Sequence, residues 1–130
     1  MGLKYPIVAV DFDGTLTIGD NYPKIGEMNM VAIQYLKQYK KLGGKLILWT
    51  CRSGLSLLHA ITKCESYGLT FDAVNSDLDS SIEAWKQKHP NEPISNKPFY
   101  NMLIDDRNYP ACVYGIDWVM VSKELLKVVD

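Results

Sequence analysis

Two carboxylates separated by one residue follow an apolar run near the start of the chain. The run is Ile-Val-Ala-Val at residues 7–10, and the carboxylates are Asp11 and Asp13. Such a β-branched apolar run predicts a strand buried on both faces. Side chains two positions apart on an extended chain lie on one side, so both acids can address one point, and carboxylate oxygens are ligands that Mg²⁺ requires. Gly14 permits a sharp turn and a close approach of a ligand to the backbone. A plain strand-to-turn boundary is the alternative, because Asp and Gly are common turn residues.

A second acidic pair follows another apolar run far along the chain. Asp105 and Asp106 come directly after Met-Leu-Ile at residues 102–104. Open α/β sheets bind ligands beyond the carboxyl ends of their strands, so the early and late acids are predicted to converge on one divalent cation. Neighbouring residues at a strand end point to different sides, so the two acids are not expected to bind it equivalently. The direct ligand is left open, with Asp105 favoured.

A hydroxyl-rich loop joins a third apolar run to a helical pattern. The predicted strand 45–50 leads into Thr-Cys-Arg-Ser-Gly at residues 50–54, and a helix that ends at Gly68 follows. The unpaired amides and the dipole of a helix N-terminus favour an anion, which makes this loop a candidate phosphate site. Ser53 fits equally well as a simple helix cap.

The remaining elements must bring these strand ends together. We expect a hairpin flap or an irregular loop at residues 16–23, an amphipathic helix from Glu27 ended by Gly43 and Gly44, and a short strand at 71–75. Further along, the patterns predict a short helix at 80–88, a last strand at 115–121 and a closing helix from Ser122.

Composition narrows the class of protein. The 130 residues are predicted to form one domain, 1–130, with 47% hydrophobic and 22% charged residues and a net charge of −1. The chain has no excess of positive charge that would favour binding to nucleic acid, and no apolar run is long enough to span a membrane. The three cysteines fit neither a disulfide framework nor a zinc site, so we expect reduced thiols and a cytoplasmic location.

The six residues Asp-Phe-Asp-Gly-Thr-Leu at 11–16 resemble the first signature motif of the haloacid dehalogenase (HAD) superfamily. Thr50 stands at the position of the second motif, Lys97 at that of the third, and the acidic pair 105–106 at that of the fourth. The resemblance therefore spans residues 11–106. It implies an α/β fold, a three-layer αβα sandwich around a mostly parallel sheet, without a cap domain because no stretch of chain is left over for one.

The resemblance also implies an activity, that of a Mg²⁺-dependent phosphatase. Asp11 would be the nucleophile that forms an aspartyl-phosphate, and Asp13 the general acid and base. The other implied roles are phosphate binding by Thr50, Cys51, Arg52 and Lys97, and Mg²⁺ binding by Asp11, Asp13 (through its backbone carbonyl) and Asp105 or Asp106.

The implied partner is a phosphorylated substrate. An open, capless site suits an exposed phosphate on a macromolecule, or a small molecule shielded by a second subunit of a homo-oligomer. The alternatives are a phosphotransferase or phosphomutase of the same superfamily, and a non-catalytic phosphate-binding regulatory domain.

Overall fold

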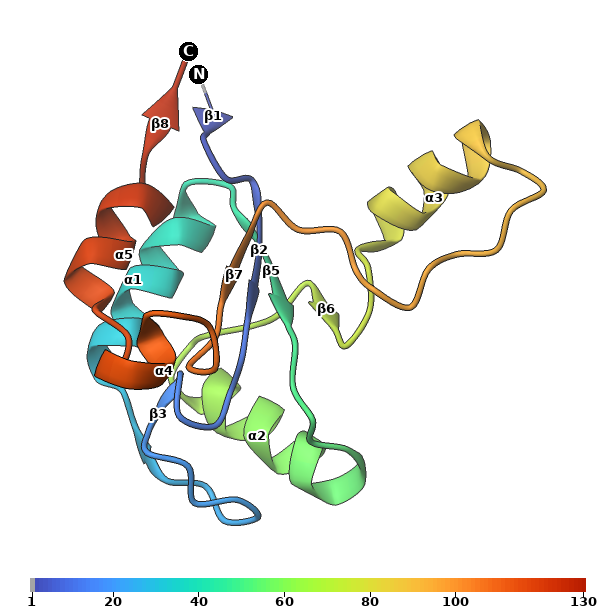
Figure 1. Ribbon diagram of the computed structural model, residues 1–130. Helices are drawn as coiled ribbons and strands as arrows, with labels where there is room; N and C mark the ends of the chain where they lie inside the picture. Colours follow the sequence, from blue (N-terminus) through green and yellow to red (C-terminus); the bar gives the residue numbers. More distant parts are fainter. Residues whose placement is uncertain (1) are drawn as a thin grey trace.

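A four-stranded parallel sheet forms the centre of the molecule, as the computed structural model of residues 2–130 shows (Figure 1). Its strand order is β6-β5-β2-β7, and every neighbouring pair is parallel. In the central register Val10 pairs with Leu48 on one side and with Ile104 on the other. The residues that follow Val10, Leu48 and Ile104 therefore lie at the same edge of the sheet. This is the arrangement predicted for the acids. The strands are β2 (Ile7–Val10), β5 (Lys45–Leu48), β6 (Ala73–Val74) and β7 (Met102–Ile104).

Three helices contribute to the apolar core on one face of this sheet. They are α1 (Met30–Lys41), α2 (Gly54–Ser66) and α5 (Trp118–Leu125). Their buried side chains join Val8, Val10, Leu46 and Leu48, which alternate along β2 and β5 with residues of the other face. No helix within residues 2–130 combines the length and the apolar character needed to cross a membrane.

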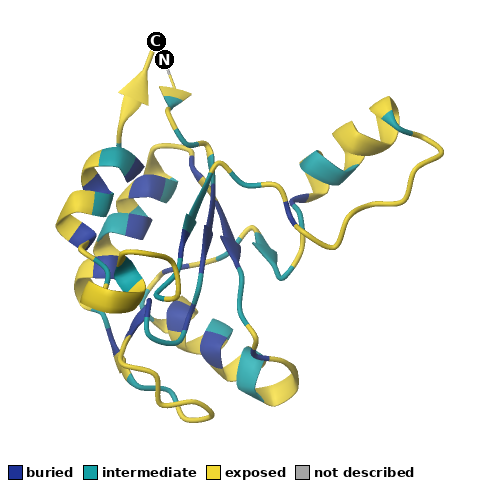
Figure 2. Cartoon of the chain, viewed as in Figure 1, coloured by how far each residue is buried: buried dark blue, intermediate teal, exposed yellow. Residues whose placement is uncertain are grey.

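The opposite face of the sheet carries a smaller cluster. Ala9, Ile47 and Leu78 are buried there, with Trp49 and Tyr100 packed against them. Helix α3 (Asp79–Lys88) contributes no buried residue and projects away from the sheet (Figures 1 and 2). The predicted α/β class with a parallel sheet is confirmed. The predicted third layer is not confirmed, because α3 does not bury a face against the sheet.

The flap predicted after the first strand is an antiparallel pair of two-residue strands. Strand β3 (Thr17–Ile18) pairs with β4 (Glu27–Met28). The helix expected from Glu27 therefore begins later, at Met30, where the Asn29 side chain caps it by accepting a hydrogen bond from the Ala32 amide (3.2 Å).

The predicted strand at 115–121 is wrong. Residues 118–125 form α5, because Trp118, Ser122 and Leu125 recur at helical spacing and are all buried, and Asp117 caps the first turn. The predicted closing helix is a continuation of α5, which ends before strand β8 (Val128–Val129). Strand β8 pairs with β1 (Gly2–Leu3), and the short helix α4 (Ala111–Tyr114) precedes α5.

Candidate functional site

A cavity of about 420 Å³ opens at the carboxyl edge of the sheet. Its walls come from the ends of β2, β5 and β7 and from the flap, as the common register of the three strands requires. Every site residue expected from the sequence lines it except Lys97. The lining residues are Asp11, Asp13, Asp20, Tyr22, Trp49, Thr50, Cys51, Arg52, Asp105, Asp106 and Arg107.

Three carboxylates from two strand ends meet in this cavity. Asp11, Asp105 and Asp106 each offer an oxygen atom, and these oxygens lie within 4.8 Å of one another. The predicted convergence is therefore confirmed for Asp11 and the late acids Asp105 and Asp106, but not for the Asp13 side chain. Three hard oxygen donors at this spacing fit a divalent cation.

Thr15 ties the two acidic strand ends together. Its hydroxyl donates to Asp11 Oδ2 (3.1 Å) and accepts a hydrogen bond from the backbone amide of Asp106 (3.1 Å). The side chain is 1% exposed, so water competes little for these bonds. The sequence predicted no such role for Thr15, which was noted only as part of the first motif, because Asp106 lies 91 positions away.

Close packing of the acids changes their protonation. Burial, reinforced by repulsion from Asp105, raises the pKa of Asp11 to about 7, and the hydrogen bond from Thr15 opposes this rise. Burial and a hydrogen bond with Asp105 also raise the pKa of Asp106, while a hydrogen bond with Asp11 and, less strongly, the positive charge of Arg107 oppose the shift. Such elevated pKa values are expected where carboxylates crowd together without a cation to offset their charge.

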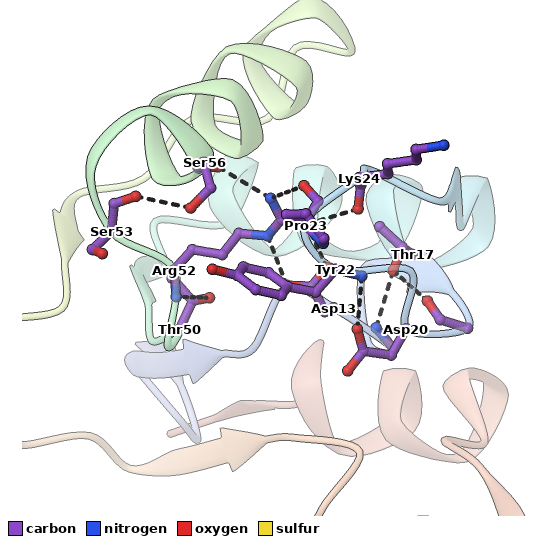
Figure 3. Close-up of polar contacts among 12 residues, drawn as sticks. Asp13, Thr17, Asp20, Tyr22, Pro23, Lys24, Thr50, Arg52, Ser53 and Ser56 are labelled. Atoms are coloured by element: carbon purple, nitrogen blue, oxygen red, sulfur yellow. Dashed lines mark hydrogen bonds and ion pairs between the residues drawn. The ribbon is translucent and has the colours of Figure 1, made fainter.

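Asp13 does not belong to this cluster, because Arg52 holds its carboxylate instead (Figure 3). The Nε and Nη2 atoms of Arg52 donate to the two oxygens of Asp13, both at 2.7 Å. The other Nη2 hydrogen is donated to the Lys24 carbonyl (2.9 Å), and Nη1 donates to the carbonyls of Pro23 and Ser56 (both 3.2 Å). All five N–H groups of the guanidinium are therefore bonded to protein.

The surroundings of Arg52 identify it as an anchor. The residue is 1% exposed, and its guanidinium lies 5.1 Å from the ring centres of both Phe12 and Tyr22. The hydrogen bonds to Asp13 raise the pKa of this arginine further. The sequence predicted a contact between Arg52 and phosphate, but in this arrangement no donor of Arg52 is left for a ligand. Its bonds join the flap, the start of α2 and Asp13.

Thr50 keeps a hydroxyl proton available to the cavity. Its Oγ1 accepts a hydrogen bond from the Arg52 amide (3.1 Å), and its own amide donates to Asn75 Oδ1 (2.8 Å). Asn75 is the one non-glycine residue with positive φ (52°) within residues 2–130. Sequence reasoning missed this support. The available signal was an asparagine at a strand end, since Asn tolerates the left-handed conformation better than most residues.

Two neighbours of Thr50 bear on its predicted role. Cys51 lines the cavity, is exposed and is not in a disulfide. Ser53 occupies the cap position of α2 but makes no side-chain cap bond, and its carbonyl accepts a hydrogen bond from the Ser56 hydroxyl (2.8 Å).

Lys97 lies outside this cavity, contrary to the placement expected from its motif position. It lines a separate cavity of about 390 Å³ together with Trp85 and Phe99. Two features hold its segment there, because Pro98 is buried and the Phe99 amide donates to the Asp77 carboxylate. Arg107, which the sequence did not single out as a site residue, lines the acidic cavity.

Comparison with solved structures finds a match to one described as the "conserved protein coded by locus from Bacteroides thetaiotaomicron". The two chains are 36% identical, with a TM-score of 0.74. The match covers 92% of this chain and 88% of the other. No family model matches the chain. No curated protein matches it either.

The conformation of Gly14 predicts a selective mutational effect. Its φ is +78°, and a Cβ there would overlap Asp106 Oδ2. We expect Gly14→Ala to displace that carboxylate. Mg²⁺ held by the three acids would then bind about tenfold more weakly or worse, measured as a smaller Mg²⁺-dependent rise in Tm. Gly19→Ala is the matched control, because Gly19 has φ +76° and open space around it. The control should cost only backbone strain of about 1 kcal/mol, and equal Mg²⁺ responses in the two variants would contradict the prediction.

The raised pKa of Asp11 predicts how stability depends on pH. Without a cation, the folded protein keeps a proton that the unfolded chain releases above its ordinary pKa of 3.8. The free energy of unfolding should therefore fall as pH rises from about 4 to about 7. Urea unfolding in EDTA measures this. The fall should be smaller in Asp11→Asn, and identical pH profiles for the two proteins would refute the shift.

The same proton predicts how Mg²⁺ affinity depends on pH. Mg²⁺ held by these acids would bind the ionised carboxylate, so binding at pH 6 would release a proton that is already gone at pH 8. With a pKa of about 7 for Asp11, the apparent Kd should be about tenfold weaker at pH 6 than at pH 8. Calorimetric titration in buffers of different ionisation enthalpy would report the released proton directly.

The saturated guanidinium of Arg52 predicts a large cost for a conservative change. Arg52→Lys keeps the charge but offers three donors to five acceptors, so we expect a loss of about 2 to 4 kcal/mol in the free energy of unfolding. Arg107→Lys is the control, because Arg107 is exposed, and it should change stability by less than about 0.5 kcal/mol. Similar urea midpoints for both variants would argue against the anchor.

Proposed function

We propose that this chain, which belongs to the same family as the conserved protein from Bacteroides thetaiotaomicron, is a Mg²⁺-dependent phosphatase of the HAD type. One observation carries the proposal. Asp11, at the end of the central strand β2, shares a cavity with the acidic pair that follows β7 and with Thr50 after β5. These are the residues that the signature motifs assign to nucleophile, metal ligands and phosphate hydroxyl.

Asp11 is the nucleophile in this proposal. A carboxylate oxygen of Asp11 attacks the phosphorus of a phosphate monoester, and the bond from phosphorus to the ester oxygen breaks. The leaving alcohol takes a proton from Asp13. In the second half-reaction Asp13 accepts a proton from water, whose oxygen attacks the phosphorus of the aspartyl-phosphate. Inorganic phosphate leaves, and the Asp11 carboxylate is restored.

Arg52 supports the role of Asp13 by fixing its position. Two 2.7 Å hydrogen bonds from one rigid guanidinium hold the carboxylate plane, and the same guanidinium is fastened to the flap and to α2. A proton-transfer group must lie within hydrogen-bond reach of the leaving oxygen, so a fixed orientation favours the reaction. In the first half-reaction, the Asp13 oxygen that carries the proton gives up its bond from Arg52. That bond forms again once the proton has passed to the leaving alcohol.

The donor set of Asp11, Asp105 and Asp106 would hold the metal ion. When bound, Mg²⁺ supplies charge neutralisation among the acids and polarises the phosphoryl oxygen. Asp13 would contribute its backbone carbonyl rather than its carboxylate, because Arg52 occupies both carboxylate oxygens. The Thr50 hydroxyl would donate to a phosphoryl oxygen from the β5 side.

The cavity is open, which bears on the substrate. Within residues 2–130 the cover next to the site is the flap of β3 and β4, and no cap domain is inserted on either side of Thr50. The proposed substrate is a phosphate monoester, either a small molecule or an exposed phosphate on a larger one.

The test is phosphate release from p-nitrophenyl phosphate and from a panel of sugar phosphates, nucleotides and phosphopeptides with Mg²⁺. Asp11→Asn should reduce release at least about a thousandfold, because it removes the nucleophile. Asp79→Asn, an exposed acid at the start of α3, is the control and should keep full activity. Acid-quenched protein should carry phosphate on Asp11. Release that survives in Asp11→Asn would exclude the proposed chemistry.

A further inference from the structure

The side chains around the cavity carry more negative than positive charge, which would oppose binding of a phosphate. Five acids line it against two arginines, and Asp13 is paired with Arg52. Four carboxylates therefore face the single remaining guanidinium of Arg107. A phosphate monoester adds up to two negative charges, and one divalent cation offsets two. Without another cation near the phosphoryl oxygens, repulsion from the acids would oppose binding of the substrate.

Two cationic side chains that the sequence suggested for this role are committed elsewhere. Arg52 has a protein acceptor for each of its donors. Lys97 lines the cavity beside α3 rather than the acidic one. Lys24 on the flap points its side chain away from Asp13, as Figure 3 shows, and binds Arg52 only through its carbonyl.

Arg107 has the position and the free donors. Its backbone amide donates to Asp105 Oδ1 (2.9 Å), and the Asn108 amide donates to the Asp105 carbonyl (3.2 Å), so the residue sits on a fixed turn directly after β7. Within residues 2–130 its guanidinium has neither an ion pair nor a hydrogen bond, although the side chain lines the acidic cavity. A free, planar guanidinium is suited to bind two phosphate oxygens at once.

The strand order places Arg107 opposite Thr50. Strand β2 lies between β5 and β7, so Asp11 lies between Thr50, which follows β5, and the turn after β7 that carries Arg107, and all three residues line the cavity. A phosphoryl group over Asp11 would be flanked by one donor from each neighbouring strand.

We propose that Arg107 binds the substrate phosphate and supplies the positive charge that the motif assigns to Lys97. This inference rests on the proposed function for the identity of the ligand. In this inference the exposed guanidinium binds oxygens that stay on phosphorus during transfer.

The experiment compares Arg107→Ala, Arg107→Lys and Lys97→Ala by two readouts. The first is calorimetric binding of inorganic phosphate with Mg²⁺, which needs no turnover, and the second is kcat/KM for the best substrate of the panel. We expect Arg107→Ala to weaken phosphate binding about tenfold or more and to lower kcat/KM about a hundredfold, with partial recovery in Arg107→Lys. Lys123→Ala, on the exposed side of α5, controls for a general loss of positive charge.

The outcomes separate this inference from the proposed function. Phosphate binding that depends on Arg107 in a protein without phosphatase activity would support the inference and overturn the function. Asp11-dependent hydrolysis with unchanged phosphate binding in Arg107→Ala would overturn the inference alone. The inference also fails if Lys97→Ala, rather than Arg107→Ala, loses phosphate affinity, or if the wild-type protein binds no phosphate.

Discussion

Repulsion among three carboxylates is the constraint that the contacts around the site must overcome. Asp11, Asp105 and Asp106 bring oxygens within 4.8 Å of one another, and unscreened charges at such distances oppose folding. Covalent geometry and hydrogen bonds hold them there. The parallel register sets the strand ends level, Thr15 bonds to both strand ends, and Gly14 leaves room for the Asp106 carboxylate. A cation bound among these acids would offset their repulsion and stabilise the folded protein.

The two arginines at the cavity differ in what their positive charges contact. Arg52 is buried, stacked between two rings and bonded through every donor, so it stabilises one arrangement of flap, loop and Asp13. The Arg107 guanidinium lines the same cavity, is exposed, and makes no hydrogen bond or ion pair with residues 2–130. A buried, fully bonded guanidinium gives rigidity, while a free one keeps its affinity for an anion. The same side-chain chemistry therefore has opposite consequences, because burial and the number of available acceptors differ.

The sequence predicted the features that depend on local pattern. Apolar runs ending in acids located β2 and β7, and their convergence followed from the behaviour of parallel strands. The sequence did not predict the features that depend on contacts between residues far apart in the chain. The periodicity of residues 118–125 competes with a strand-like apolar run, and packing of Trp118 and Leu125 resolves it as helix. Lys97 matched a motif, but the path of its segment is fixed by the bond from Phe99 to Asp77. The burial of Arg52 depends on flap carbonyls that no spacing rule identifies.

Helix α3 and the connector after it extend from the body of the molecule and share little apolar surface with it (Figure 2). Because no residue of this helix is buried, changes in its length or sequence leave the register of β2 and β7 intact. Changes confined to this arm are therefore expected to leave the acids after β2 and β7 in place. Divergence among relatives should accumulate there first, because no core contact constrains the sequence of this helix.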